Sequence, residues 1–129
     1  MELRLKLQNV LMVAKKYTKN KLYVVFGCGG DRDIEKRNLM GKIASKIADK
    51  VIVTDDNPRS EDPALIRKQI IENCKNILEI AGRDKAIERS IKLLGNDDVL
   101  MIAGKGHETE QYIGSKVIWT PRCSRVPNM

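Results

Sequence analysis

The sequence predicts an α/β fold, a three-layer sandwich in which a mostly parallel sheet carries helices on both faces. Short apolar runs alternate along the chain with segments in which apolar residues recur at helical spacing. This alternation is typical of parallel strands joined by helical crossovers. The runs are continuously apolar, as expected of strands buried on both faces. Polar turns, some rich in glycine, follow several of the runs.

The first half of the chain predicts two helices and two strands. Apolar residues recur every three or four positions over 3–17 and again over 39–48, and each pattern predicts an amphipathic helix. The apolar runs 22–26 and 51–53 predict strands. The polar, glycine-rich segment 27–33 is expected to form a turn after the first strand.

The second half continues the alternation of helices and strands. Pro63 suits the first turn of a helix, with Asp62 as its N-cap. Asp84 is expected to cap the helix that follows. Apolar runs predict three further strands, the last of them the weakest, over 77–80, 99–103 and 116–119.

The length and composition indicate one soluble domain. The chain has 129 residues, of which 42% are apolar and 32% charged, as in ordinary soluble proteins. We expect the domain to span residues 1–119, and residues 120–129, with two prolines and no periodicity, to form a disordered tail. Because charges interrupt the apolar stretches, the sequence predicts neither a membrane span nor a secretory signal. We therefore expect a cytoplasmic protein.

A net charge of +7 would suit nucleic-acid binding, but the distribution of the charge argues against it. Residues 1–21 hold six Lys and Arg against one acidic residue, and residues 116–129 hold three against none. Residues 22–115 hold 15 basic and 16 acidic residues. The excess of positive charge therefore lies at the two ends, and we expect no nucleic-acid partner.

Cysteine and histidine usage indicates neither disulfides nor a metal centre. The chain has three cysteines, with no C-x-x-C pair, and one histidine. An odd number of scattered cysteines disfavours a disulfide framework, and it disfavours a zinc site as well. We expect no bound metal, and free thiols that suit a reducing compartment.

Three polar segments are expected to meet at one edge of the sheet. They follow predicted strands and span residues 27–33, 54–59 and 104–108. In open α/β sheets, ligands bind at the carboxyl ends of the strands. The sequence therefore predicts a polar pocket formed by these segments.

The side chains of these segments favour a ligand that carries both signs of charge. Guanidinium groups of Arg32 and Arg59 suit carboxylates or phosphates. The carboxylates of Asp56 and Glu108 suit an ammonium group. A pocket with both kinds of group suits a zwitterion such as an amino acid. The candidate binding residues are Arg32, Asp56, Asn57, Pro58, Arg59, Gly104 and Glu108.

Three alternative motifs fail at one or two positions each. A dinucleotide-binding G-x-G-x-x-G would need glycine where Arg32 stands. A phosphate-binding P-loop would need glycine at Val99 and Ser or Thr at Gly106. A zinc-protease motif would need a second histidine where Gln111 stands.

Simpler explanations of the same residues stay open at this point. The glycines of 27–30 would serve equally well in a tight turn. Taken alone, the segment 56–58 is more typical of a turn than of a binding site. Lys105 suits either a solvated position or a phosphate contact, and His107 suits a hydrogen bond to the backbone.

Three longer blocks of sequence carry a family resemblance. They are Val25 to Asp33, continued by Lys36-Arg37 and Leu39-Met40-Gly41; Val53 to Arg59, followed by Glu61-Asp62-Pro63; and Ala103 to Glu108, followed by Gln111. Together, and in this order, they resemble the Mur ligases, in particular those that make UDP-N-acetylmuramoyl-tripeptide.

The resemblance implies a Rossmann-like C-terminal ligase domain. Such ligases join meso-diaminopimelate, or in some bacteria L-lysine, to UDP-MurNAc-L-Ala-D-Glu in peptidoglycan synthesis, with ATP and Mg²⁺ as cofactors. By match, Arg32, Asp56, Asn57, Arg59, Gly104 and Glu108 would contact the diaminopimelate. Lysine-adding members generally lack the arginine of the D-N-P-R motif. An arginine fork at Arg59 can pair with the second carboxylate of diaminopimelate, which lysine does not have.

The resemblance also implies segments that precede this chain. A strand and a Y-A-H-T-P-D segment are expected before the first helix, as are the domains that bind ATP and the UDP-sugar. We therefore expect the sheet to lack its first strand, and this chain alone to bind no cofactor and to catalyse no ligation. The alternative function is a non-catalytic amino-acid-binding module derived from that domain.

Overall fold

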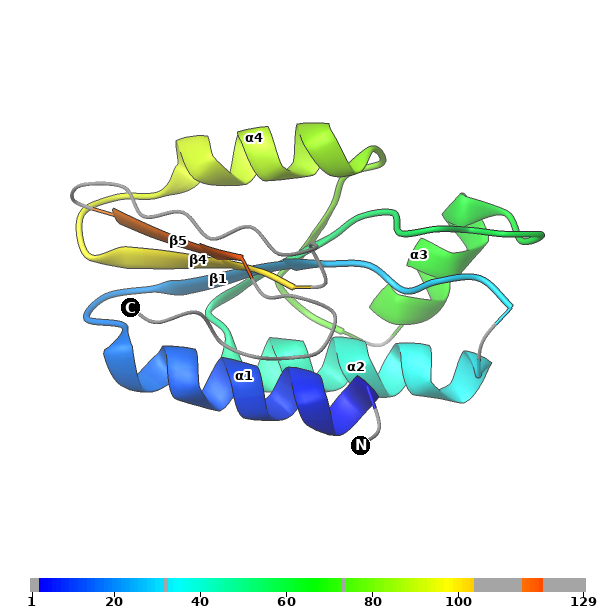
Figure 1. Ribbon diagram of the computed structural model, residues 1–129, viewed down its shortest axis with the longest axis horizontal. Helices are drawn as coiled ribbons and strands as arrows, with labels where there is room; N and C mark the ends of the chain where they lie inside the picture. Colours follow the sequence, from blue (N-terminus) through cyan, green and yellow to red (C-terminus); the bar gives the residue numbers. More distant parts are fainter. Residues whose placement is uncertain (1–2, 32, 73, 104–114, 120–129) are drawn as a thin grey trace.

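A parallel sheet lies at the centre of the molecule (Figure 1). The computed structural model describes residues 3–31, 33–72, 74–103 and 115–119. Within them the strands follow the order β3-β2-β1-β4-β5, and each neighbouring pair is parallel. The strands are β1 (Leu22–Phe26), β2 (Lys50–Val53), β3 (Ile77–Glu79), β4 (Asp98–Ile102) and β5 (Ser115–Trp119).

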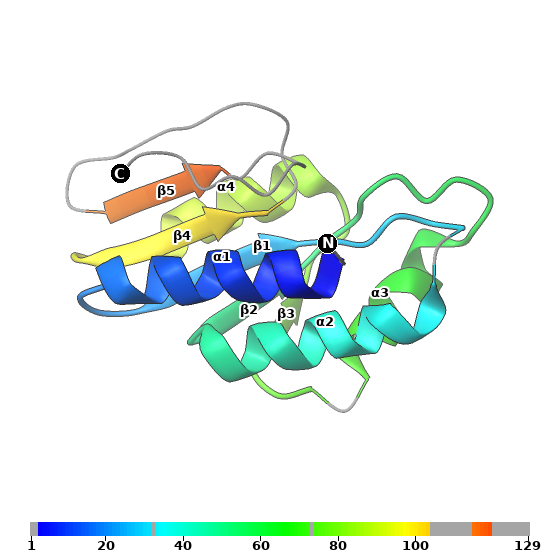
Figure 2. The ribbon, with the colours of Figure 1, turned by 60° about the horizontal axis from the view of Figure 1, so that its bottom comes forward.

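Helices cover both faces of the sheet, so the predicted three-layer sandwich is confirmed. Figure 1 shows α4 on one side of the sheet and α1 and α2 on the other, and Figure 2 shows α3 beside α2. The helices are α1 (Leu3–Tyr17), α2 (Ile34–Ile47), α3 (Pro63–Ile71) and α4 (Arg83–Leu93). The expectation that a strand is missing ahead of α1 stays a prediction.

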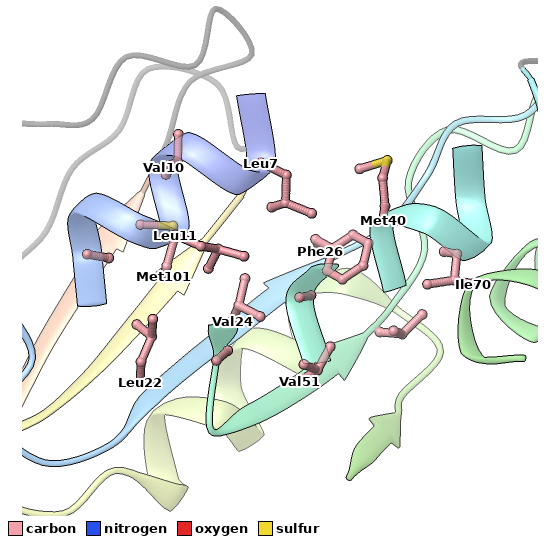
Figure 3. Packing of buried hydrophobic residues seen from close by; sticks show 14 of the residues in the cluster. Leu7, Val10, Leu11, Leu22, Val24, Phe26, Met40, Val51, Ile70 and Met101 are labelled. Carbon is pink, nitrogen blue, oxygen red and sulfur yellow. The ribbon is translucent and has the colours of Figure 1, made fainter. Parts of the chain in front are cut away.

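The apolar runs form the core because the sheet is covered on both sides. All five residues of β1 are buried, and so are all five of β4. Val24 pairs with Val51 of β2 on one side and with Met101 of β4 on the other. The larger apolar cluster lies between the sheet and α1, α2 and α3, and Figure 3 shows members of it, among them Leu11, Met40, Val24 and Phe26. A smaller cluster lies under α4.

Asp62 and Pro63 predict the start of α3 correctly. Asp62 is the N-cap of α3, its carboxylate accepts a hydrogen bond from the Ala64 amide at 3.0 Å, and Pro63 is the first helical residue. Asp33 caps α2 in the same way, accepting from the Glu35 amide. The helix α2 therefore begins at Ile34, five residues before the predicted segment, because its first turn holds one exposed apolar residue, Ile34, followed by charged residues and so shows no apolar stripe.

The prediction that Asp84 caps α4 is wrong. The N-cap is Gly82, which has φ of 85° and no side chain to accept a hydrogen bond, and Asp84 lies in the first turn. The amide of Gly82 donates instead to Asp55 Oδ2 at 3.1 Å. A glycine suits this position because its positive φ strains other residues. Asp84 still complements the positive end of the helix dipole.

The strand order creates a switch point beside β1. The chain passes from β1 to β2 on one side, and only after β3 and α4 does it return to β4 on the other side. In doubly wound sheets, ligands bind at the carboxyl ends of the strands near such a point. The segments that leave β1 and β2 lie at this edge.

No helix in the described part of the chain is long and apolar enough to cross a membrane.

Candidate functional site

The segments that follow β1 and β2 lie side by side beyond the end of the sheet. The Thr54 amide donates to the Phe26 carbonyl at 3.0 Å, so pairing continues past the last paired residues of the strands. Further along, the Gly30 amide donates to the Asn57 carbonyl at 2.8 Å. Two of the three segments expected to converge, 27–33 and 54–59, therefore do so. The third, 104–108, lies outside the described residues.

The glycines of the first segment allow the two backbones to approach each other closely. A Cβ on Gly27 would lie 2.4 Å from the Thr54 carbonyl oxygen, and one on Gly30 would lie 1.8 Å from the Pro58 carbonyl oxygen. Atoms cannot come this close, so any side chain would push the segments apart. Close approach, rather than a turn alone, explains these two glycines.

Side chains of residues 56–59 bond to the backbone of their own segment. Asp56 Oδ1 accepts from the Asn57 amide at 2.8 Å, and Asn57 Oδ1 accepts from the Arg59 amide at 3.2 Å. Arg59 has φ of 50°, in the left-handed region that few residues other than glycine adopt. The segment leads into a turn at Pro58 to Glu61, in which the Glu61 amide donates to the Pro58 carbonyl at 2.9 Å. The turn also gives Arg59 one defined backbone conformation.

The side chain of Arg59 reaches across to the first segment. Its Nη1 donates to the Gly30 carbonyl at 2.9 Å, and it lies close enough that a Cβ on Gly29 would be 2.7 Å from Nη1. A guanidinium has five N–H donors. The guanidinium of Arg59 is planar, one of its donors is bound to Gly30, and the residue is exposed. Such a group suits the recognition of a carboxylate.

A buried arginine lies beneath the two segments, and apart from its place in the family resemblance it had no predicted role. Arg37 of α2 is 1% exposed, and its guanidinium contacts both carboxylate oxygens of Glu61. It also donates to the Gly29 carbonyl at 3.2 Å and to Gln69 Oε1 of α3 at 2.6 Å. Arg37 therefore joins the segment after β1, α2, α3 and the segment that leads into α3.

The surroundings of Glu61 keep its carboxylate ionised. Hydrogen bonds from the Arg37 side chain and, secondly, from the Asp31 amide lower the pKa of the Glu61 carboxyl to about 2. The same bond with Glu61 raises the pKa of the Arg37 guanidinium. Both partners are therefore charged over the whole physiological pH range.

The sequence carries one weak signal for this pair. Arg37 shares the buried face of α2 with Met40, Gly41 and Ala44, three to seven residues further along. A charged residue on an apolar stripe requires a partner, because an unpaired buried charge is costly. The stripe does not indicate which acidic residue supplies the partner.

A second ion-pair cluster lies on the β3 side of the same edge. Arg67 of α3 contacts Asp55, which follows β2, and donates from Nε to Glu79 Oε2 of β3 at 2.9 Å. Asp55 also accepts from the Gly82 amide at the start of α4. These contacts fix the other end of the segment that carries residues 56–59.

The described part of the chain contains two cysteines. Cys28 and Cys74 are both free, and burial raises the pKa of the Cys28 thiol to about 12. Within the described ranges, no group of three or more His, Cys, Asp or Glu residues could hold a metal ion.

The structure describes four of the seven candidate binding residues, Asp56, Asn57, Pro58 and Arg59, and it brings them together with Gly29 and Gly30. The other three, Arg32, Gly104 and Glu108, lie outside the described residues, as do Lys105 and His107.

Comparison with known proteins identifies the family. A family model described as "Mur ligase, glutamate ligase domain" matches residues 5–106. The chain belongs to the Mur ligase family. The recognition made from the three sequence blocks is therefore confirmed, and the chain corresponds to the C-terminal domain of these ligases.

Two relatives of this Mur ligase domain are named UDP-N-acetylmuramoyl-L-alanyl-D-glutamate--2,6-diaminopimelate ligase. The relative from Rickettsia prowazekii (strain Madrid E) is 61% identical over 99 residues, which cover 75% of this chain and 21% of the relative. The one from Agrobacterium fabrum (strain C58 / ATCC 33970) is 49% identical over 109 residues, which cover 84% of this chain and 22% of the relative.

A solved structure of a ligase with the same name is also similar. It has a TM-score of 0.74 and 40% identity to this Mur ligase domain, and the match covers 86% of this chain and 23% of that chain. The chain thus spans about a fifth of the length of the curated relatives it matches.

Proposed function

We propose that this chain binds meso-diaminopimelate as the amino-acid-binding domain, over residues 1–119, of an ATP-dependent amide ligase of peptidoglycan synthesis. The ligase would add the amino acid to UDP-MurNAc-L-Ala-D-Glu. The relatives named as diaminopimelate ligases support this reaction. The observation that carries the proposal is the position of Arg59, whose side chain is anchored on the Gly30 carbonyl at the carboxyl edge of the sheet.

Arg59 explains how the site would distinguish two similar amino acids. Diaminopimelate has a second carboxylate at the end where lysine has only an ammonium group. The guanidinium of Arg59 would pair with that carboxylate, whereas lysine would leave the guanidinium without an anionic partner. A site built to pair with a group discriminates against an analogue that lacks it. Asp56 and Asn57 lie in the same segment, and Arg32, Gly104 and Glu108 are proposed to complete the pocket.

The chemistry of ATP and Mg²⁺ would belong to other parts of such a ligase. The sequence fails the P-loop pattern at Val99 and Gly106, and the described residues contain no cluster suited to a metal ion. We therefore assign no step of phosphoryl transfer to these residues.

The free thiols of Cys28 and Cys74 suit a reducing compartment, which supports a cytoplasmic location. No nucleic-acid or membrane partner is proposed.

Calorimetry with the purified chain tests this function. We expect meso-diaminopimelate to bind with a measurable heat, and L-lysine to bind about tenfold more weakly or not at all. ATP serves as a control ligand in a separate thermal-denaturation experiment. At millimolar concentration it should leave the melting temperature of the chain unchanged. Binding of ATP without any binding of diaminopimelate would overturn the proposal.

A further inference from the structure

The Glu61 carboxylate links the two segments of the candidate site. Its Oε2 accepts from the Asp31 amide at 2.5 Å and from Arg37 Nη2 at 2.5 Å. The first donor belongs to the segment after β1, whereas Glu61 itself follows the turn that carries Arg59. One carboxylate therefore fixes the spacing between both segments.

Asp31 in turn accepts hydrogen bonds from the segment that carries Glu61. The carboxylate of Asp31 accepts from Ser60 Oγ at 2.5 Å and from the Ser60 amide at 3.4 Å. Each segment thus supplies a carboxylate that accepts from the other segment. Residues so joined are held more firmly than a single hydrogen bond would hold them.

Two residues at or near these contacts have unfavourable backbone conformations. Asp31 has φ of 57° and Arg59 has φ of 50°. Non-glycine residues in this region persist only where their surroundings fix them, and they cluster at functional sites. Asp31 contacts Glu61 directly, and Arg59 lies two residues before Glu61 in the chain.

Arg37 anchors this arrangement from beneath and cannot touch a ligand itself. Its side chain is 2% exposed, whereas that of Glu61 is 23% exposed. Besides Glu61, it contacts the Gly29 carbonyl and Gln69 of α3. Any effect of Arg37 on a ligand must therefore act through the segments above it.

We propose that Arg37 and Glu61 are positioning residues, which hold Arg59 in the geometry that selects an amino acid with a second carboxylate. This inference rests on the proposed function and deepens it. Arg59 would contact the ligand, and the Arg37–Glu61 pair would determine where the Arg59 guanidinium lies.

The test replaces Glu61 by glutamine, which keeps the shape of the side chain and removes its charge. Glu88→Gln is the matched control, because Glu88 forms an exposed ion pair with Lys92 on α4 at 3.3 Å. Two quantities are measured for each variant. One is the ratio of the dissociation constants for L-lysine and meso-diaminopimelate. The other is the hydrogen-exchange rate of the Gly30 amide, which donates to Asn57.

We expect Glu61→Gln to bring the lysine-to-diaminopimelate ratio close to one and to speed Gly30 exchange about tenfold. The Val99 amide, which donates to the Lys21 carbonyl at the opposite edge, should speed up less than the Gly30 amide, by no more than the global loss of stability requires. In an Arg59→Ala background, Glu61→Gln should change the ratio no further, because residues that act through one another are not additive. Glu88→Gln should change neither quantity.

Several outcomes would overturn the inference. An unchanged ratio in Glu61→Gln, or equal acceleration at Gly30 and Val99, would reduce the pair to a general structural role. If the unsubstituted chain does not bind diaminopimelate, the proposed function fails, and the exchange of Gly30 relative to Val99 still decides whether the pair positions these segments. If Glu61→Gln does not fold, Ser60→Ala, which removes only the Oγ–Asp31 bond, must raise Gly30 exchange for the inference to stand.

Discussion

The guanidinium of Arg37 contacts both carboxylate oxygens of Glu61, with Nη1–Oε1 at 3.0 Å and Nη2–Oε2 at 2.5 Å, although 24 residues separate the two in sequence. Two parallel contacts of this kind fix the orientation of both groups as well as their distance. The pair joins α2 to the residues just before α3, at the edge where the candidate site lies.

Replacing Arg37 should destabilise the domain strongly. Arg37→Met keeps much of the apolar stem but leaves Glu61 without its charged partner. Breaking a buried ion pair costs about 3–5 kcal/mol. Because Glu61 is partly exposed, we expect a loss of free energy of unfolding near the lower end of that range, measured by urea denaturation. Glu88→Gln should change it by less than about 0.5 kcal/mol. Equal effects of the two variants would show that burial of Arg37 has no energetic consequence.

The same pair predicts a dependence of stability on pH. The carboxyl of Glu61 has a pKa of about 2 in the folded chain, below its ordinary value of 4.5. A lowered pKa stabilises the fold above the unfolded value, and this contribution disappears as pH falls through the folded value. The difference in free energy of unfolding between the unsubstituted chain and Glu61→Gln should be constant above about pH 5. It should shrink from about pH 4.5 toward pH 2. A difference that grows on acidification would contradict this.

Gly30 and Gly82 should respond differently to alanine. A Cβ at Gly30 would collide with the Pro58 carbonyl, whereas one at Gly82 would meet nothing within 4 Å and only the positive φ opposes it. We expect Gly30→Ala to lower the melting temperature and to abolish diaminopimelate binding, with a stability cost of about 2 kcal/mol or more. Gly82→Ala should cost about 1 kcal/mol and leave binding intact. Normal binding by Gly30→Ala would show that the two segments separate without loss of the site.

Two aspartates near helix starts provide a separate comparison. Asp62 accepts a hydrogen bond from the Ala64 amide as the N-cap of α3, and Asp84 lies within the first turn of α4. Asp62→Ala should cost about 1 kcal/mol of stability through the lost cap. Asp84→Ala should cost about 0.5 kcal/mol or less through the helix dipole alone. Thermal denaturation of both variants measures the difference, and a larger loss in Asp84→Ala would be the contrary result.

The sequence predicted the elements better than their arrangement. The strand at 22–26 was predictable because a continuous apolar run needs only local information, and Asp62-Pro63 marked a helix start for the same reason. The strand order β3-β2-β1-β4-β5 depends on pairing between distant segments, which no local pattern encodes. The cap of α4 was predicted at the wrong residue because Gly82 is favoured by a positive φ that only the fold requires.

In the candidate site, too, local features were predictable and contacts between distant segments were not. Residues 56–59 could be found because polar residues follow an apolar run at a place where ligands bind. The Arg37–Glu61 pair could not, because its partners come together only when α2 packs beside α3. The close approach of Gly30 to Pro58 depends on the same packing.

In the proposed function, Arg59 binds the second carboxylate of meso-diaminopimelate. The most direct measurement is a calorimetric comparison of meso-diaminopimelate and L-lysine, carried out with the unsubstituted chain and with Arg59→Ala. We expect the substitution to weaken diaminopimelate binding about tenfold or more and to leave lysine binding nearly unchanged, so that the preference disappears. A preference for diaminopimelate that persists undiminished in Arg59→Ala would contradict the proposed function.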